Sequence, residues 1–175
     1  EEIVKSHGGS KDSDIDADEE RIISGALNFS NKKVDEVMTP RSVAFMLEEK
    51  EVLDQKLLNK IKKNGFTRVP VYRGEKDKVV GILFVRDLIG LKLEKKVKAV
   101  CKKNNFLKVS VEDNLDYVLN RFLTKKIHLA SVFDKFNVLQ GIISLEDVLE
   151  EIIKKEIVDE SDVAVDLRRV ARKKR

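Results

Sequence analysis

"GIISLEDVLEEII", residues 141–153, is a short apolar run that leads directly into a segment with helical periodicity. The same junction occurs sixty positions earlier as "GILFVRDLIG", residues 81–90, with an aspartate again six residues after the glycine. A repeated strand-to-helix junction indicates two copies of one supersecondary unit. The aligned copies differ at one position that affects their chemistry, where Ser144 of the second corresponds to Phe84 of the first.

The similarity extends upstream of both junctions. Two further pairs of segments align: "GFTRVPVYRGEKDKVVG" (65–81) with "KIHLASVFDKFNVLQG" (126–141), and "VLDQKLLNKIKK" (52–63) with "NLDYVLNRFLTKK" (114–126). Each copy predicts a helix, a short strand, a polar turn, an apolar strand and a closing helix. The strands are expected over 69–72 and 79–84 in the first copy, and over 129–133 and 138–143 in the second. We therefore expect an α+β fold of two αββα units whose sheets pack face to face.

The amino-acid composition indicates what class of protein this is. The 175 residues are 42% hydrophobic and 38% charged, which is typical of a globular protein with a heavily charged exterior. The longest apolar run, residues 79–85, is far shorter than the ~20 residues that a membrane-spanning helix needs. Cys101 is the single cysteine, so no intramolecular disulfide can form, which fits a reducing cytosolic setting.

The chain divides into five predicted parts: an acidic leader 1–15, a linker helix 16–33, a first repeat 34–95, a second repeat 96–158 and a basic tail 159–175. The linker is amphipathic, with acids in its first turn. The basic tail is interpreted as a solvated terminus, and contact with nucleic acid or anionic lipid is the alternative. Nucleic acid is disfavoured because no aromatic residue lies among the tail bases to stack on nucleotides.

The stretch "SLED", residues 144–147, has two interpretations. As structure, Ser144 and Asp147 form a capping box, in which the serine oxygen accepts a backbone amide and the acid bonds back. As a ligand site, the helix start exposes amides that suit phosphate, and a carboxylate can accept hydrogen bonds from a ribose diol. Phe84 has no hydrogen-bonding group at the matching place. Of the two junctions, only the second is therefore expected to bind a nucleotide.

Three longer motifs point to a known family. "GALNFSNKKVDEVMTPR" (25–41), "FTRVPVY" (66–72) and "GIISLEDVLEEIIKKEIVDESD" (141–162) resemble, in this order and spacing, the cytosolic module of the cyclin M / CorB–CorC family of magnesium transport proteins. The two-copy αββα pattern itself looks like a CBS-domain pair, or Bateman module. The resemblance covers about residues 16–165, most of the chain.

The resemblance implies a module that binds ATP, with magnesium held through its phosphates, between the two repeats. The implied site residues come from three segments: Thr39, Phe66, Thr67, Arg68, Val69, Pro70, Ser144 and Asp147. Thr39 would lie near the adenine, and Phe66 and Val69 would offer apolar surface to the base. Arg68, after Thr67, would offer a fixed cation to the phosphates, a role that guanidinium suits.

For each of these residues a structural role is also possible. Arg68 could form a surface salt bridge, and Phe66 could be a core contact. In the second repeat His128 and Leu129 stand where the first has Thr67 and Arg68, so the mirror pocket lacks this phosphate cation. His128 itself is interpreted as a half-buried strand residue.

The resemblance also implies partners. Two modules are expected to pair through their closing helices into a disc-like homodimer, attached to a transmembrane transport domain at the cytoplasmic face of the cell membrane. A phosphatase partner is doubtful, because the link after the first repeat, residues 90–100, is short where animal members carry a docking loop. A nucleotide-free structural or interaction module is the alternative function.

No enzyme is predicted. The acids of residues 12–16 have calcium-loop spacing but lack the loop's glycine and final glutamate. The two histidines and Cys101 match no metal or nucleophile motif, and the phosphate loop of ATP hydrolases is absent from the sequence.

Overall fold

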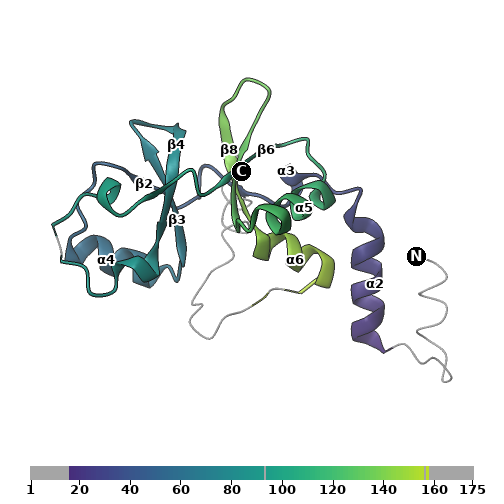
Figure 1. Ribbon diagram of the computed structural model, residues 1–175. Coiled ribbons are helices and arrows are strands. Elements are labelled where there is room, and N and C mark those ends of the chain that lie inside the picture. The colour runs from purple at the N-terminus through teal and green to yellow at the C-terminus, as the bar shows by residue number, and fades with distance from the viewer. Residues whose placement is uncertain (1–15, 93, 156, 158–175) are drawn as a thin grey trace.

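The computed structural model describes residues 16–92, 94–155 and 157. Two α/β lobes lie side by side with their sheets turned toward each other, and a separate helix lies at one edge (Figure 1). None of the helices within the described residues is long and apolar enough to cross a membrane.

The first lobe is built from the first repeat. Its elements are β2 (Leu47–Glu48), α4 (Gln55–Lys63), β3 (Arg68–Arg73), β4 (Glu75–Phe84) and the 3₁₀ helix η1 (Val85–Leu88). The sheet order is β2-β3-β4-β5, where β5 is the short strand Lys102–Lys103; β2 is parallel to β3 and the other pairs are antiparallel. Asp54 caps α4 by accepting a hydrogen bond from the Leu57 amide at 2.7 Å, and the apolar side of this helix covers the sheet with Leu57 and Ile61.

The second lobe repeats this order. Its elements are β6 (Leu107–Ser110), α5 (Leu115–Lys125), β7 (Leu129–Phe133), β8 (Leu139–Ser144) and α6 (Leu145–Ile153). The sheet order is β1-β8-β7-β6, where β1 is the short strand Thr39–Pro40, again with one parallel pair, β6 and β7. The two strands that each repeat was predicted to contain are therefore confirmed, and β7 has the predicted bounds.

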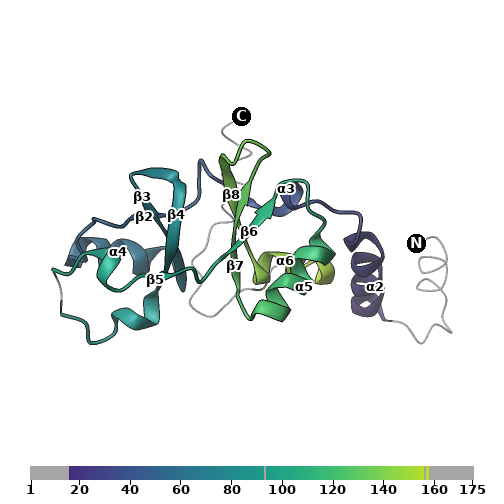
Figure 2. The ribbon, with the colours of Figure 1, turned by 45° about the horizontal axis from the view of Figure 1, so that its top comes forward.

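The sheet of each lobe includes one short strand borrowed from the start of the other repeat. β1 (Thr39–Pro40) lies at the start of the first repeat but pairs with β8. β5 (Lys102–Lys103) lies at the start of the second repeat but pairs with β4 (Figure 2). Both contacts are close because a glycine faces the borrowed strand. A Cβ on Gly141 would lie 2.4 Å from the Thr39 carbonyl oxygen, and one on Gly81 would lie 2.5 Å from that of Lys102. The glycine repeated in the two junctions is thus required by this exchange.

Three clusters of buried side chains hold the fold together. One lies inside each lobe, between its sheet and its helices. The third combines residues of both repeats across the facing sheets: Ala44, Met46, Val79, Phe133 and Leu139. The prediction of two sheets that share a core is confirmed.

Three predicted details are wrong. The first closing helix is only the four-residue η1, because the chain turns soon afterwards at Gly90, whose φ is +73°. The hairpin between β3 and β4 turns at Gly74, so Glu75 already belongs to the strand. The pattern "EDVLEEIIKKEIVDE" (146–160) predicts a longer closing helix, but α6 ends at Ile153, where Lys154 takes a left-handed conformation (φ 51°).

The edge helix α2 (Ala17–Phe29) docks on the end of α6. Asp16 and Glu19 start α2 with a capping box. Gly25 faces the last turn of α6 so closely that a Cβ would lie 1.9 Å from the Ile152 carbonyl oxygen. Arg21 donates to the Ile153 carbonyl at 2.9 Å and so satisfies one free acceptor at the end of α6.

A half-buried charge cluster secures the same docking. Lys32 Nζ lies 2.6 Å from Glu151 on α6, and Lys154 pairs with the same carboxylate. Burial alone would raise the pKa of Glu151, but the hydrogen bonds and charges of the two lysines hold it below its ordinary value. A lowered folded-state pKa means that the cluster stabilises the fold at neutral pH, and that this contribution is lost as the pH falls through that pKa.

We predict that Gly25→Ala destabilises the fold, although alanine favours a helix by about 1 kcal/mol over glycine. The added methyl group would overlap the α6 backbone, and such overpacking costs about 1–3 kcal/mol. Urea unfolding would measure the loss, and hydrogen exchange would show whether α2 opens first. Leu27→Ala is the control, because this side chain lies on the exposed side of α2. Equal stability of the two variants would contradict the close packing at Gly25.

Candidate functional site

The second junction is a complete capping box. β8 ends at Ser144 and α6 begins at the next residue. Ser144 Oγ accepts from the Asp147 amide at 3.0 Å, and Asp147 Oδ2 accepts from the Ser144 amide at 2.8 Å and from its hydroxyl at 2.6 Å. The structural interpretation of "SLED" is confirmed. Ser144 and Asp147 are both partly exposed residues at the helix start, so a capping role does not bury them away from a ligand.

The "FTRVP" segment leads from α4 into β3. Phe66 is half-buried and stacks on Phe45, with ring centroids 5.4 Å apart and planes 18° apart. Val69 is fully buried in the core of the first lobe, and Pro70 is also buried. The Val69 side chain therefore cannot offer apolar surface to a base as expected, because the sheet and α4 enclose it. Phe66 keeps a partly exposed ring.

Arg68 reaches from the first repeat to the second. Its Nη1 lies 3.4 Å from Glu146 on α6, and its Nη2 lies 3.5 Å from Nδ1 of His128, just before β7. A third long contact, 3.4 Å, joins Nη1 to the hydroxyl of the exposed Thr67. All three distances lie at the outer limit of a hydrogen bond. The guanidinium is thus held loosely, by groups on both sides of the boundary between the repeats.

Thr39 lies on the same edge as the second junction. Its strand β1 pairs with β8, and Thr39 is opposite Ile142, two residues before Ser144. Thr39 is half-buried. The predicted residues therefore come from β1, the start of β3 and the start of α6. The contact between Arg68 and Glu146 joins the last two of these across the repeats.

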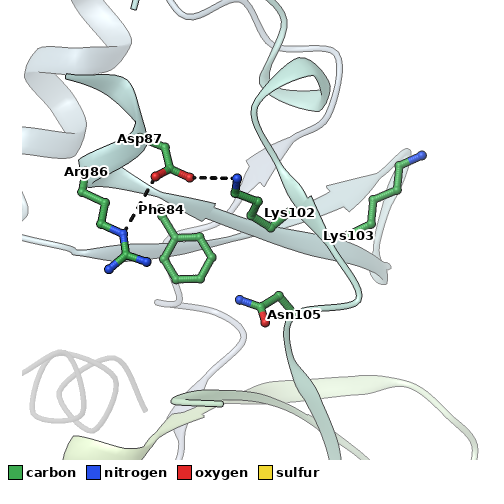
Figure 3. Close-up of a pocket in the computed structure, with 6 residues that line it drawn as sticks. All are labelled: Phe84, Arg86, Asp87, Lys102, Lys103 and Asn105. Atoms are coloured by element: carbon green, nitrogen blue, oxygen red, sulfur yellow. Dashed lines mark ion pairs between the residues drawn. The ribbon is translucent and has the colours of Figure 1, made fainter. Parts of the chain in front are cut away.

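The first junction is different. A pocket of about 360 Å³ lies there, lined by Phe84, Arg86, Asp87, Lys102, Lys103 and Asn105 (Figure 3). Phe84 contributes its ring to this lining. The pocket does not include the residues predicted to bind a nucleotide.

Sequence reasoning missed two features of these sites. His128 is near Arg68, although the sequence indicated only a half-buried strand residue. The basic pair Lys102–Lys103 occupies in the first lobe the place that Thr39–Pro40 occupies in the second. Aligning "VMTP" (37–40) with "VCKK" (100–103) could have shown this second relation.

The described part of the chain contains histidine, cysteine and acidic side chains, the residue types that can ligate a metal ion. No group of three or more histidine, cysteine, aspartate or glutamate side chains is placed there to hold a metal ion. Burial raises the pKa of the Cys101 thiol, which disfavours the reactive thiolate. Of the acids with calcium-loop spacing, Asp16 caps α2, and residues 12–15 lie outside the described residues.

Comparison with known proteins agrees with this architecture. Residues 55–94 and 97–154 match the family model of the CBS domain. The chain is 37% identical over 164 residues to the metal transporter cnnm-1 of Caenorhabditis elegans, and the match covers 86% of this chain and 20% of that protein. It is 35% identical over 145 residues to hemolysin C of Brachyspira hyodysenteriae, over 82% of this chain and 53% of that protein. The chain thus spans about a fifth and about half of these relatives.

Solved structures give the same result. The CBS domain of a bacterial CNNM/CorC family Mg²⁺ transporter has a TM-score of 0.77 and 30% identity, over 90% of this chain and 94% of that one. A CBS domain of this transporter family in complex with ATP has a TM-score of 0.71 and 30% identity, over 78% of this chain and 98% of that one. The two repeats, the exchanged strands and the matched segments have one explanation: this chain belongs to the CBS-domain family, as a CBS-domain pair of the CNNM/CorC type.

Proposed function

We propose that this chain is the regulatory module of a membrane transporter for magnesium or another divalent cation, and that it binds Mg–ATP between its two repeats. The ligand would be held by Thr39, Phe66, Thr67, Arg68, Val69, Pro70, Ser144 and Asp147, with Val69 and Pro70 limited to their backbone groups. The module would lie at the cytoplasmic face of the membrane. The repeat boundaries 34–95 and 96–158 are part of the proposal.

One observation carries it: the Arg68 guanidinium of the first repeat lies 3.4 Å from Glu146, in the first turn of α6. This contact brings a cation, the Ser144 hydroxyl and the Asp147 carboxylate to one edge of the two lobes. Cation, hydroxyl and carboxylate are the groups that phosphate and ribose require. The similar CNNM/CorC CBS domain in complex with ATP supports the same ligand class.

The loose hold on Arg68 suits a change of partner. Arg68 and Glu146 are both partly exposed, and such an ion pair contributes only about 0–1 kcal/mol. Arg68 could therefore turn from Glu146 to a phosphate at little cost. Glu146 would then remain beside the phosphates without its cation.

Magnesium would offset the repulsion between the phosphates of ATP and the acidic side chains at the start of α6. Glu146, Asp147 and Glu150 place three acids on the first two turns of α6. Magnesium bridges phosphate oxygens while it keeps several waters, so it would lower the repulsion between a triphosphate and these acids. In this proposal the acids of α6 create the repulsion that magnesium would offset, and the phosphates of ATP would be the ligands of the magnesium.

The same helix gives a route for regulation. α6 begins at the proposed site and ends against α2 through the Arg21 hydrogen bond, and Lys32, three residues after α2, pairs with Glu151 near the same end. Ligand binding that favours one position of α6 over another would shift α2 with it, provided the two arrangements differ in affinity. A disc-like homodimer formed through the closing helices would pass this shift to a transport domain.

A nucleotide-free scaffold is the second candidate. The capping box at Ser144 and the half-buried stack of Phe66 on Phe45 are complete structural roles without any ligand. Such a scaffold would have the same fold and would show no thermal shift with ATP.

We predict that Asp147→Ala reduces the stabilisation by Mg–ATP to about 0.4–1.4 kcal/mol at the same ligand concentration, while the protein stays folded. A ligand at a hundredfold excess over its dissociation constant stabilises a protein by about 2.7 kcal/mol. Loss of a charge-assisted ribose contact costs about 1.5–3 kcal/mol of binding, roughly ten- to a hundredfold. Loss of the capping acid costs about 1 kcal/mol of stability. Thermal unfolding with and without Mg–ATP measures both effects.

Asp87→Ala is the matched control for this experiment. It removes the equivalent carboxylate of the first junction, where Phe84 replaces the serine. This variant should keep its response to Mg–ATP. If Mg–ATP stabilises the two variants equally, residues 144–147 serve only as a helix cap, and the nucleotide-free scaffold is the better explanation.

We predict that Glu146→Gln weakens the dependence of ATP binding on magnesium. The substitution removes the acid nearest to Arg68 and should tighten metal-free ATP by about fivefold, the equivalent of ~1 kcal/mol. AMP should depend on magnesium less than ATP, in the native protein and in the variant. Calorimetric titration with magnesium and with a chelator measures this. If chelation leaves ATP affinity unchanged in the native protein, the electrostatic argument is wrong.

A further inference from the structure

His128 lies beside the start of α6, next to the proposed nucleotide site. Its neighbour Leu129 is opposite Ser144 in the pairing of β7 with β8, and the His128 carbonyl accepts from the Leu145 amide at 3.1 Å. These contacts involve the backbone of His128 or the residue that follows it. The fold therefore does not require the imidazole here, and the side chain contacts other side chains instead.

The imidazole lies between two side chains of opposite charge. Its Nδ1 is 3.5 Å from Nη2 of Arg68, at the start of β3, and 3.9 Å from Oε1 of Glu146, in the first turn of α6. Arg68 and Glu146 are themselves 3.4 Å apart. All three side chains are partly exposed. They form one cluster that contains groups from both repeats.

The other charged groups around His128 are less directly placed. Lys125 and Lys126 precede it in the chain and are exposed. Asp147 and Glu150 follow on α6, where Asp147 accepts from the Ser144 amide and hydroxyl. Among the residues that the structure describes, none of these four forms an ion pair with His128. A charge on the imidazole therefore acts mainly on Arg68 and Glu146.

The protonation state of His128 decides which of these two partners it can bind. A guanidinium only donates hydrogen bonds, so Arg68 can bond to Nδ1 only while that nitrogen carries no proton. A protonated imidazole donates from both nitrogens and is positively charged, so it repels Arg68 and attracts Glu146. One proton on His128 would thus give Glu146 a new cation and separate Arg68 from the cluster.

We propose that His128 is a positioning residue for Arg68, and that protonation of His128 releases Arg68 from Glu146 toward the phosphates of Mg–ATP. This inference rests on the proposed nucleotide function and adds control by protons to the same site. The protonated imidazole also neutralises Glu146 after Arg68 has left it, which lowers the repulsion between this acid and the phosphates. Affinity for Mg–ATP therefore rises as the pH falls through the range in which histidine changes its charge, about pH 8 to 5.

Other groups with a shifted pKa keep their charge in the middle of this range. Lys32 and Lys154 hold the pKa of Glu151 below its ordinary value, so Glu151 stays ionised at about pH 6. Burial raises the pKa of the Cys101 thiol, so Cys101 stays protonated at about pH 8. A pH effect on binding that disappears when His128 is replaced thus comes from the imidazole.

The test is calorimetric titration of the whole chain with ATP in excess magnesium, at about pH 6 and about pH 8, on either side of the ordinary histidine titration. We expect binding to be about five- to tenfold tighter at the lower pH, at the small end of measured couplings because solvent screens these exposed charges. Titrations in buffers of different ionisation enthalpy should show net uptake of protons on binding. His128→Gln should lose the affinity difference and the proton uptake, with an unchanged melting temperature.

His7→Gln is the matched control, because His7 is the other histidine of the chain. This variant should keep the native pH dependence and proton uptake. The inference is overturned if native affinity is equal at the two pH values, or if His128→Gln retains the native difference. It is also overturned if His128→Gln weakens binding equally at both pH values, since that would be a purely structural role. Absence of Mg–ATP binding at both pH values would overturn the proposed nucleotide function as well, so the two failures are distinguishable.

Discussion

The reciprocal exchange of two short strands is the constraint on which the rest of the structure depends. β1 and β5 each pair with the sheet of the other lobe, and Gly141 and Gly81 make room for them. A methyl group at either glycine would meet a backbone carbonyl at about 2.5 Å, closer than side chains tolerate. The exchange fixes the two lobes with their sheets facing, and it places a borrowed strand beside each strand-to-helix junction.

The two strand-to-helix junctions share the same backbone arrangement and differ in a few side chains. At the second junction, hydroxyl and carboxylate groups at the start of α6 meet a single guanidinium from the other repeat. At the first, an aromatic ring and two lysines replace them, and the carboxylate becomes a support for a cation. Duplication supplied two equivalent places, and only the second keeps the serine and the uncommitted helix start that the proposed nucleotide site needs, because at the first Phe84 replaces the serine and Asp87 pairs with Arg86 and Lys102.

The helix α6 connects the proposed ligand site, at its first turn, with α2, at its last turn. Its first turn carries the acids that face Arg68, and its last turn carries the carbonyl groups that receive Arg21 and exclude a side chain at Gly25. The Lys32–Glu151 pair adds a charge contact whose strength depends on protonation of Glu151. A single helix thus connects the candidate ligand to the segment that precedes the two lobes in the chain.

The sequence by itself determined the repeated αββα order, the strand β7, the capping box at Ser144 and the helix α2, because each depends on local periodicity or on residues within four positions. It did not show the strand exchange or the meeting of Arg68 with Glu146 and His128, since these groups are 60 to 78 positions apart. The burial of Val69 was also missed, because an apolar strand residue can face either the core or a ligand. Only packing of the two lobes decides which side chains remain exposed, and therefore which of the predicted site residues can act.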